Sequence, residues 1–108
     1  MQSAQNCQFI FVSVGGEENA SAISRALVEN KLAACVSRIP QMTSVYRWED
    51  KIQEDREILL IIKTQKIHSE KVEELIKKVH TYDVPEIVSI SLEEASSGYL
   101  GWLLKETS

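Results

Sequence analysis

Apolar and polar positions follow two alternating periods along the first third of the chain. The continuous apolar run Phe9–Val12 ends at Gly15-Gly16, which predicts a strand buried on both faces and followed by a turn. The next apolar residues, beginning at Ala22, recur at helical spacing, with charged residues between them. This pattern predicts a helix from about residue 18 to residue 31.

A long β-hairpin is expected next. The mostly apolar segment Leu32–Ile39 is interrupted at Pro40, and Ser44–Trp48 resumes with β-branched and aromatic residues. A turn at Glu49-Asp50-Lys51 leads into a second strand with an apolar centre at Ile58–Ile62. Because proline cannot donate to a strand ladder, Pro40 indicates a bulge, a bend or a sheet edge.

The second helix has the clearest pattern. Its apolar residues fall at positions i, i+3, i+4 and i+7, namely Val72, Leu75, Ile76 and Val79. Charged residues occupy the opposite face, and Ser69 is the expected N-cap. This segment is therefore predicted to cover a hydrophobic core.

Two further elements complete the predicted fold. Residues 87–92, introduced by Pro85, alternate apolar residues with serines and predict a strand, and residues 99–104 predict a short amphipathic helix. The order β-α-β-β-α-β-α indicates one α+β domain over residues 1–108, with a flexible N-terminus at 1–7. Its first six elements match a ferredoxin-like βαββαβ sandwich, in which both helices cover one sheet face. The other face needs a cover, and a partner subunit is the economical one.

Composition and charge limit the classes of molecule that this chain is expected to bind. The 108 residues are 44% hydrophobic and 26% charged, with a formal net charge of −4 and no basic block. We therefore expect neither nucleic acid nor a membrane surface as a partner. The N-terminal residues have neither the basic nor the apolar region of a secretory signal, and two cysteines, Cys7 and Cys35, make a weak case for a disulfide framework. A cytoplasmic location is expected.

Five short blocks, in order and at matching spacing, resemble the signatures of the CutA divalent-cation tolerance family. The blocks are Leu32–Val36, Thr43–Glu49, Ile62–Thr64, His80–Glu86 and Tyr99–Leu103. The resemblance covers about residues 9–107. It implies a ferredoxin-like fold and a tight homotrimer, similar to the PII signalling proteins, in which hairpin strands pair across subunits. It also implies an association with tolerance to divalent metals, chiefly copper.

The chain departs from the family pattern at three places. Asp50 stands where the family often has glycine in the hairpin turn, and aspartate tolerates a left-handed backbone better than most residues. Thr81 and Asp83 replace two residues of the block after the second helix. Val12 and Val79 stand where some members have a cysteine and a first histidine, which leaves His80 alone.

The candidate metal ligands are Cys35, His80, Asp83 and Glu86. Thiolate and imidazole are ligands that copper prefers, and the carboxylates would add oxygen. Each residue has a plainer interpretation, which we favour from the sequence alone. Cys35 would be a small buried hydrophobe, His80 would contact the last carbonyls of its helix, and the carboxylates would be surface charge. Copper or another divalent cation is thus a possible ligand, not one required for folding.

The expected intersubunit pocket involves Tyr46, Arg47, Trp48, Lys63 and Tyr82. Tyr46 and Trp48 share one strand face and Arg47 lies on the other. Packing against a neighbouring subunit is the favoured interpretation. The alternative is a PII-like module that holds a small anionic ligand between subunits.

Catalysis is not expected, because the chain contains no Ser-His-Asp order, no HExxH motif and no nucleophile elbow. Three functions remain. They are a trimeric metal-associated protein, a PII-like ligand-binding module, and a trimeric scaffold that anchors another protein.

Overall fold

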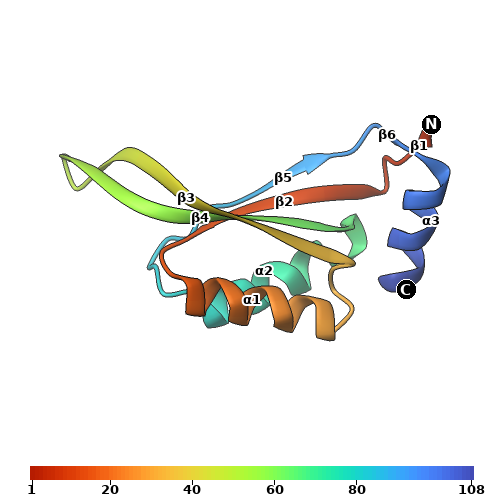
Figure 1. The fold of residues 1–108 in the computed structure, drawn as a ribbon, viewed down its shortest axis with the longest axis horizontal. Coiled ribbons are helices and arrows are strands. Elements are labelled where there is room, and N and C mark those ends of the chain that lie inside the picture. Colours follow the sequence, from red (N-terminus) through yellow and green to blue (C-terminus); the bar gives the residue numbers. More distant parts are fainter.

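The computed structural model describes all 108 residues and contains a four-stranded sheet, two helices beneath it and a third helix at one end (Figure 1). The elements are β1 (Gln2–Ser3), β2 (Cys7–Val14), α1 (Glu17–Glu29), β3 (Cys35–Trp48), β4 (Lys51–Gln65), the 3-10 turn η1 (Lys66–His68), α2 (Ser69–Val79), β5 (Ile87–Ser91), β6 (Glu94–Ala95) and α3 (Ser97–Glu106). No helix is long and apolar enough to cross a membrane.

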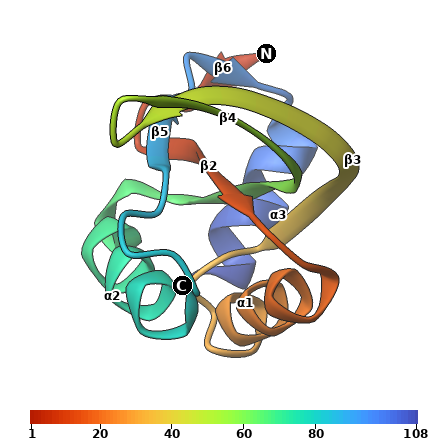
Figure 2. The same cartoon turned by 90° about the vertical axis from the view of Figure 1, so that its left-hand side faces the viewer.

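The main sheet has the strand order β3-β4-β2-β5, and every neighbouring pair is antiparallel. With α1 and α2 on one face, this is the predicted ferredoxin-like arrangement, and the additional C-terminal helix is present. Viewed from the end, the two helices lie side by side below the sheet, and no helix covers the sheet on its upper side (Figure 2). The sheet therefore has a helix-covered face and an open face.

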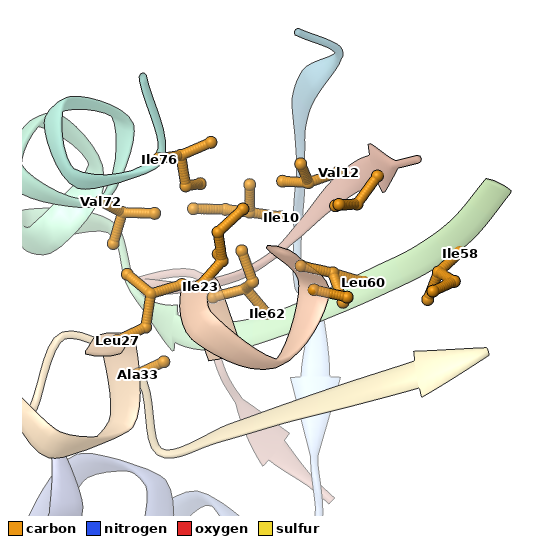
Figure 3. Close-up of a cluster of buried hydrophobic side chains, with 12 residues drawn as sticks. Ile10, Val12, Ile23, Leu27, Ala33, Ile58, Leu60, Ile62, Val72 and Ile76 are labelled. Atoms are coloured by element: carbon orange, nitrogen blue, oxygen red, sulfur yellow. The ribbon is translucent and has the colours of Figure 1, made fainter. Parts of the chain in front are cut away.

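The hydrophobic core lies between the helix-covered face and the two helices. Alternate residues of β2 and β4 point into it, and α1 and α2 contribute one side chain per turn (Figure 3). Ile23, Leu27, Leu60, Ile62 and Ile76 are fully buried there. Burial of a side chain of this size contributes about 1.5–3 kcal/mol, so this layer stabilises the position of every strand.

The hairpin of β3 and β4 extends past the end of β2 as an arm, defined here as residues 42–57 (Figure 1). The turn residues Glu49 and Asp50 both have positive φ, 50° and 65°, as a two-residue type I′ turn requires. The register shifts between Ile39 and Met42, which confirms the irregularity expected at Pro40. The arm raises the radius of gyration to 14.6 Å, compared with about 13 Å for a compact chain of this length.

Several local details differ from expectation. The N-terminus, expected to be flexible, has defined contacts, since Gln2–Ser3 pairs with β6. Ala4 and Cys7 pack against Leu100 and Leu103 of α3. The sequence gave no sign of this pairing, because a two-residue strand has no readable period.

The helix boundaries also differ. Helix α1 ends at Glu29, and Lys31 has a φ of 58°, so the chain turns before β3 begins at Cys35. The N-cap of α2 is His68 and not Ser69, whose hydroxyl donates to the Lys66 carbonyl. The 3-10 turn η1 places Ser69 one residue inside the helix.

Candidate functional site

A groove lies between the hairpin arm and the segment that links α2 to β5. It has a volume of about 770 Å³. It is lined by residues of the arm, of the linking segment and of the end of β2, namely Ser13, Ser44, Val45, Tyr46, Trp48, Asp55, Glu57, Thr81, Tyr82, Asp83, Val84 and Glu86. Its lining includes four carboxylates and no lysine or arginine. The groove thus combines aromatic rings with negative charge.

Two tyrosine–carboxylate pairs lie within the groove. The Tyr46 hydroxyl donates to Asp55, its diagonal neighbour across the hairpin, since the register sets Ser44 opposite Asp55. The Tyr82 hydroxyl donates to Glu57 Oε2 at 2.9 Å. Burial and the bond to Glu57 raise the pKa of Tyr82 well above its ordinary value of 10.0. The bond to Asp55 likewise raises the pKa of Tyr46, so both hydroxyls keep their protons at neutral pH.

The linking segment is held against the sheet by His80. Its Nε2 lies 2.8 Å from the Ser13 carbonyl oxygen, and its Nδ1 accepts from the Tyr82 backbone N–H at 3.0 Å. Since Nδ1 accepts, the neutral ring carries its proton on Nε2. The Asn19 amide donates to the Val79 carbonyl at 2.8 Å. His80 therefore orients Tyr82, with the two rings 4.6 Å apart.

Gly15 leaves room for the tyrosine. A Cβ atom at Gly15 would lie 2.8 Å from the Tyr82 hydroxyl oxygen, whereas a Cβ at Gly16 would meet nothing within 4 Å. Gly15, expected only as part of a simple turn, thus also makes room for the Tyr82 side chain that reaches Glu57.

Cys35 lies elsewhere, on the open face of the sheet. It is half-buried and faces Lys63 in the register, and its sulfur lies 3.8 Å from the Ser37 hydroxyl. Lys63 Nζ donates to that hydroxyl at 2.9 Å and lies 5.8 Å from the Phe9 ring centroid. Cys35 and Lys63 are thus neighbours, in a cluster separate from the groove.

The predicted metal ligands do not converge within one subunit. His80 bonds to Ser13, which pairs with Leu59, whereas Cys35 pairs with Lys63. Four residues along a strand span about 13 Å, so the two side chains belong to different parts of the sheet.

Asp83 and Glu86 both line the groove. His80 has both ring nitrogens hydrogen-bonded, and its side chain does not bond the last carbonyls of α2. No three His, Cys, Asp or Glu side chains are placed to hold a metal ion. The side chains of one subunit therefore do not fit a metal site.

The five expected pocket residues separate into two groups. Tyr46, Trp48 and Tyr82 line the groove together, while Arg47 and Lys63 do not. Arg47 is exposed and pairs with Ile52, and alternation along β3 turns it away from Tyr46 and Trp48. Within one subunit, the aromatic residues of the expected pocket therefore lie together and its two cations lie elsewhere.

Asp55 and Glu57 are groove residues that sequence reasoning missed. A signal existed for Asp55, because a two-residue turn at Glu49-Asp50 fixes the pairing of Ser44 with Asp55. The same register places Glu57 opposite Met42, but its hydrogen-bond donor, Tyr82, lies in the loop after α2, which the local pattern does not place.

Comparison with known proteins gives one consistent family. The model described as CutA1 divalent ion tolerance protein matches residues 8–106. The divalent-cation tolerance protein CutA of Thermus thermophilus is 43% identical over 100 residues, which cover 93% of this chain and 97% of the relative. Protein CutA of Mus musculus is 43% identical over 97 residues, 90% of this chain and 55% of the relative. The chain thus spans about half the length of the mouse relative.

Two further comparisons agree. Protein CutA, chloroplastic, of Arabidopsis thaliana is 41% identical over 98 residues, which are 91% of this chain and 54% of the relative. The solved structure of the divalent cation tolerance protein from Thermus thermophilus superposes with a TM-score of 0.92 at 42% identity, covering 94% of this chain and 99% of that chain. Sequence and fold therefore point to the same relatives.

Proposed function

Because the chain belongs to the CutA1 divalent ion tolerance family, we propose that it is a homotrimeric protein that binds divalent cations, copper among them, and takes part in the response to metal ions. Family membership is the observation that carries this proposal. We propose no catalytic role, and we propose that folding requires no metal or cofactor.

The open face of the sheet supports the trimer. Val88 and Ile90 of β5 are 51% and 50% exposed, and they lie beside Phe11 and Phe9 in the register. Ile39, on the edge strand β3, is 48% exposed. A contiguous apolar surface of this kind marks an interaction site. Second and third copies of the chain would cover it and pair with the free edge of the long hairpin.

Light scattering tests the trimer. At low micromolar concentration we expect a mass about three times the 12.2 kDa subunit, independent of dilution. A monomer mass would refute the proposed assembly.

Metal binding by this protein would be weak if it used one subunit alone. Asp83 and Glu86 offer oxygen from the groove, and Cys35 lies on the open face that the trimer would cover. His80 would have to give up one of its two hydrogen bonds.

Titration with copper under reducing conditions should show weaker binding in Cys35→Ser or His80→Ala than in the native protein. If neither substitution changes the affinity, both residues lose their proposed metal role.

A growth assay tests the cellular function. Cells that lack their own CutA protein should tolerate raised copper better when they express this chain than when they carry an empty vector. Equal growth of the two cultures would contradict the proposal.

We also propose a cytoplasmic location, with which two unpaired cysteines agree. Fluorescence microscopy of a tagged chain checks this location.

No observation favours the alternatives as strongly. A PII-like anionic ligand would need cations, and the groove lining contains none. The scaffold alternative has no surface specific to it, because the open sheet face is already assigned to copies of the chain.

A further inference from the structure

A second pocket, called here the α1–β3 pocket, lies between α1 and the edge strand β3 (Figure 2). It has a volume of about 340 Å³ and shares no residue with the groove. Val36 and Arg38 of β3 line it, and they lie opposite Ile62 and Leu60, which are fully buried in the main core. Residues opposite each other on neighbouring strands point to the same face. Both side chains therefore lie on the helix-covered side of the sheet and not on the open face.

Helix α1 provides the other wall of the pocket. Ser21, Arg25 and Val28 line it at positions i, i+4 and i+7, so they share one face of the helix. Val28 is 44% exposed, whereas Val36 packs against the main core. The pocket thus combines two valine side chains with two guanidinium groups.

The charge of this lining is opposite to that of the whole chain. Arg25 and Arg38 face one carboxylate, that of Glu29, in a chain whose net charge is −4. Arg38 belongs to neither ion pair of the chain. Arg25 lies 3.7 Å from Glu29 in an exposed pair, and pairs of this kind contribute little. Both guanidinium groups therefore keep N–H donors for an anion.

The number of donors indicates which anion fits. A guanidinium group presents its donors in a planar fork that matches two oxygen atoms. A carboxylate has two oxygens and satisfies one fork, whereas a phosphate monoester has three terminal oxygens and a charge of about −1.5 to −2 at pH 7. The Ser24 hydroxyl already donates to the Ala20 carbonyl at 2.7 Å, while the Ser21 hydroxyl has no partner in the chain. Two arginines and one free hydroxyl match a phosphate group better than a carboxylate.

We infer that the α1–β3 pocket binds a small organic phosphate monoester. Arg25, Arg38 and the Ser21 hydroxyl donate to the phosphate oxygens, and the organic part lies against Val28 and Val36. The volume of about 340 Å³ lies within the range of small-molecule sites. This binding does not depend on the proposed metal response, because none of the four candidate metal ligands lines the pocket.

Calorimetry of the metal-free native oligomer tests the inference with matched probes. Glycerol 3-phosphate should bind saturably with a dissociation constant below about 10 mM, and more weakly at higher salt. Glycerol, which lacks the phosphate, should not bind. Malonate, a dianion with two carboxylates, should bind at least about fivefold more weakly than glycerol 3-phosphate. Inorganic phosphate should also bind more weakly, because it has no organic part to contact the valines.

Three results of this titration would overturn the inference. The first is no binding of glycerol 3-phosphate, which is expected if a neighbouring copy of the chain fills the pocket. The second is binding of malonate with equal affinity, which would show that charge alone is recognised. The third is tighter binding of inorganic phosphate, which would exclude a monoester as the preferred ligand.

A pair of arginine variants locates the site. Arg38→Gln should weaken binding of glycerol 3-phosphate at least about tenfold. Arg56→Gln removes the same charge from the other strand of the hairpin, but Arg56 is absent from the lining, so it should change the affinity less than about twofold. Both residues are exposed, so both variants should fold. Equal losses of affinity would show a general charge effect and refute the site.

A pair of glutamate variants tests the opposite direction. Glu29→Gln should strengthen binding of glycerol 3-phosphate by about two- to fivefold, because it removes a competitor for Arg25. Glu73→Gln breaks the comparable Lys77–Glu73 pair on α2, outside the pocket, and should leave the affinity unchanged. Unchanged or weaker binding in Glu29→Gln would overturn the assignment. Copper titration of Arg38→Gln should match the native protein, which separates failure of this inference from failure of the metal proposal.

Discussion

The two faces of the main sheet differ in what covers them. On the helix-covered face, Leu60, Ile62 and Ile76 are fully buried by the chain itself. The alternation of apolar and polar residues in β5 is typical of a strand with one buried face. On the open face, however, the apolar side chains of Val88 and Ile90 remain half exposed. Both faces are apolar, so the difference lies in where the helices pack. Helices α1 and α2 pack on the same side of the sheet, and α3 lies at one end (Figures 1 and 2).

The largest expected effect belongs to the helix-covered face. Ile76→Ala should lower the free energy of unfolding by about 2–5 kcal/mol, because a fully buried isoleucine leaves a cavity. Leu75→Ala should cost less, since Leu75 only packs against the edge of the core. Urea denaturation at fixed protein concentration measures both. A larger loss for Leu75→Ala would contradict the assigned core.

On the open face, Val88→Asp should dissociate the assembly without unfolding the subunit. A charge at an exposed position costs a lone subunit about 0.5 kcal/mol or less. In a trimer the same charge would be buried and unpaired. We expect the protein concentration at half-dissociation to rise at least about tenfold. Sedimentation velocity measures the mass, with Val88→Ile as the control. An unchanged mass for Val88→Asp would mean that this face is not the interface.

The hydrogen bond between Tyr82 and Glu57 in the groove should have a smaller effect on stability, and this effect should depend on pH. Tyr82→Phe should cost about 1 kcal/mol at pH 8, because it removes a partly exposed hydrogen bond to Glu57. The folded state raises the pKa of Tyr82, so the unfolded chain ionises first, above about pH 10. Stability from this group is present below that pH and is lost as the pH rises further. The difference in unfolding free energy between the native protein and Tyr82→Phe, measured by urea titration, should therefore decrease above pH 10. An increase in that difference would refute this assignment.

The smallest effect is expected at the tip of the arm. Asp50→Gly should change stability by less than about 1 kcal/mol, because glycine adopts the positive φ of 65° without strain. Asp50→Val should destabilise the hairpin, since a β-branched residue at this φ is a genuine outlier. Thermal unfolding of both variants measures the contrast. A large loss in Asp50→Gly would show that the carboxylate has a further contact.

Much of the fold was predictable because its signals are local. The spacing of Val72 and Ile76 and the irregularity at Pro40 each depend on neighbouring residues, and the structure confirms both. The turn expected at Glu49-Asp50-Lys51 is present but contains only its first two residues, because Lys51 begins β4. The N-terminal pairing with β6 was missed because it joins two-residue strands from opposite ends of the chain. Local period carries no information about such a contact.

The candidate site was predictable only in part. Tyr46 and Trp48 were assigned to one strand face from alternation alone, and they line the groove together. The pairing of Tyr82 with Glu57 joins residues 25 positions apart, and it depends on the room left at Gly15. The sequence could not place Lys63 outside the groove either, because that follows from where the arm leaves the body of the sheet.

The sequence by itself determined the order of elements, the family and the apolar character of both sheet faces, because these follow from residue type and spacing. Only the tertiary structure decided which face the helices cover, that Cys35 and His80 lie apart, and that four carboxylates meet three aromatic rings in one groove. The physical reason is that register and helix packing act between segments far apart in the chain. A shift of one residue in the strand register would turn every side chain of that strand to the other face.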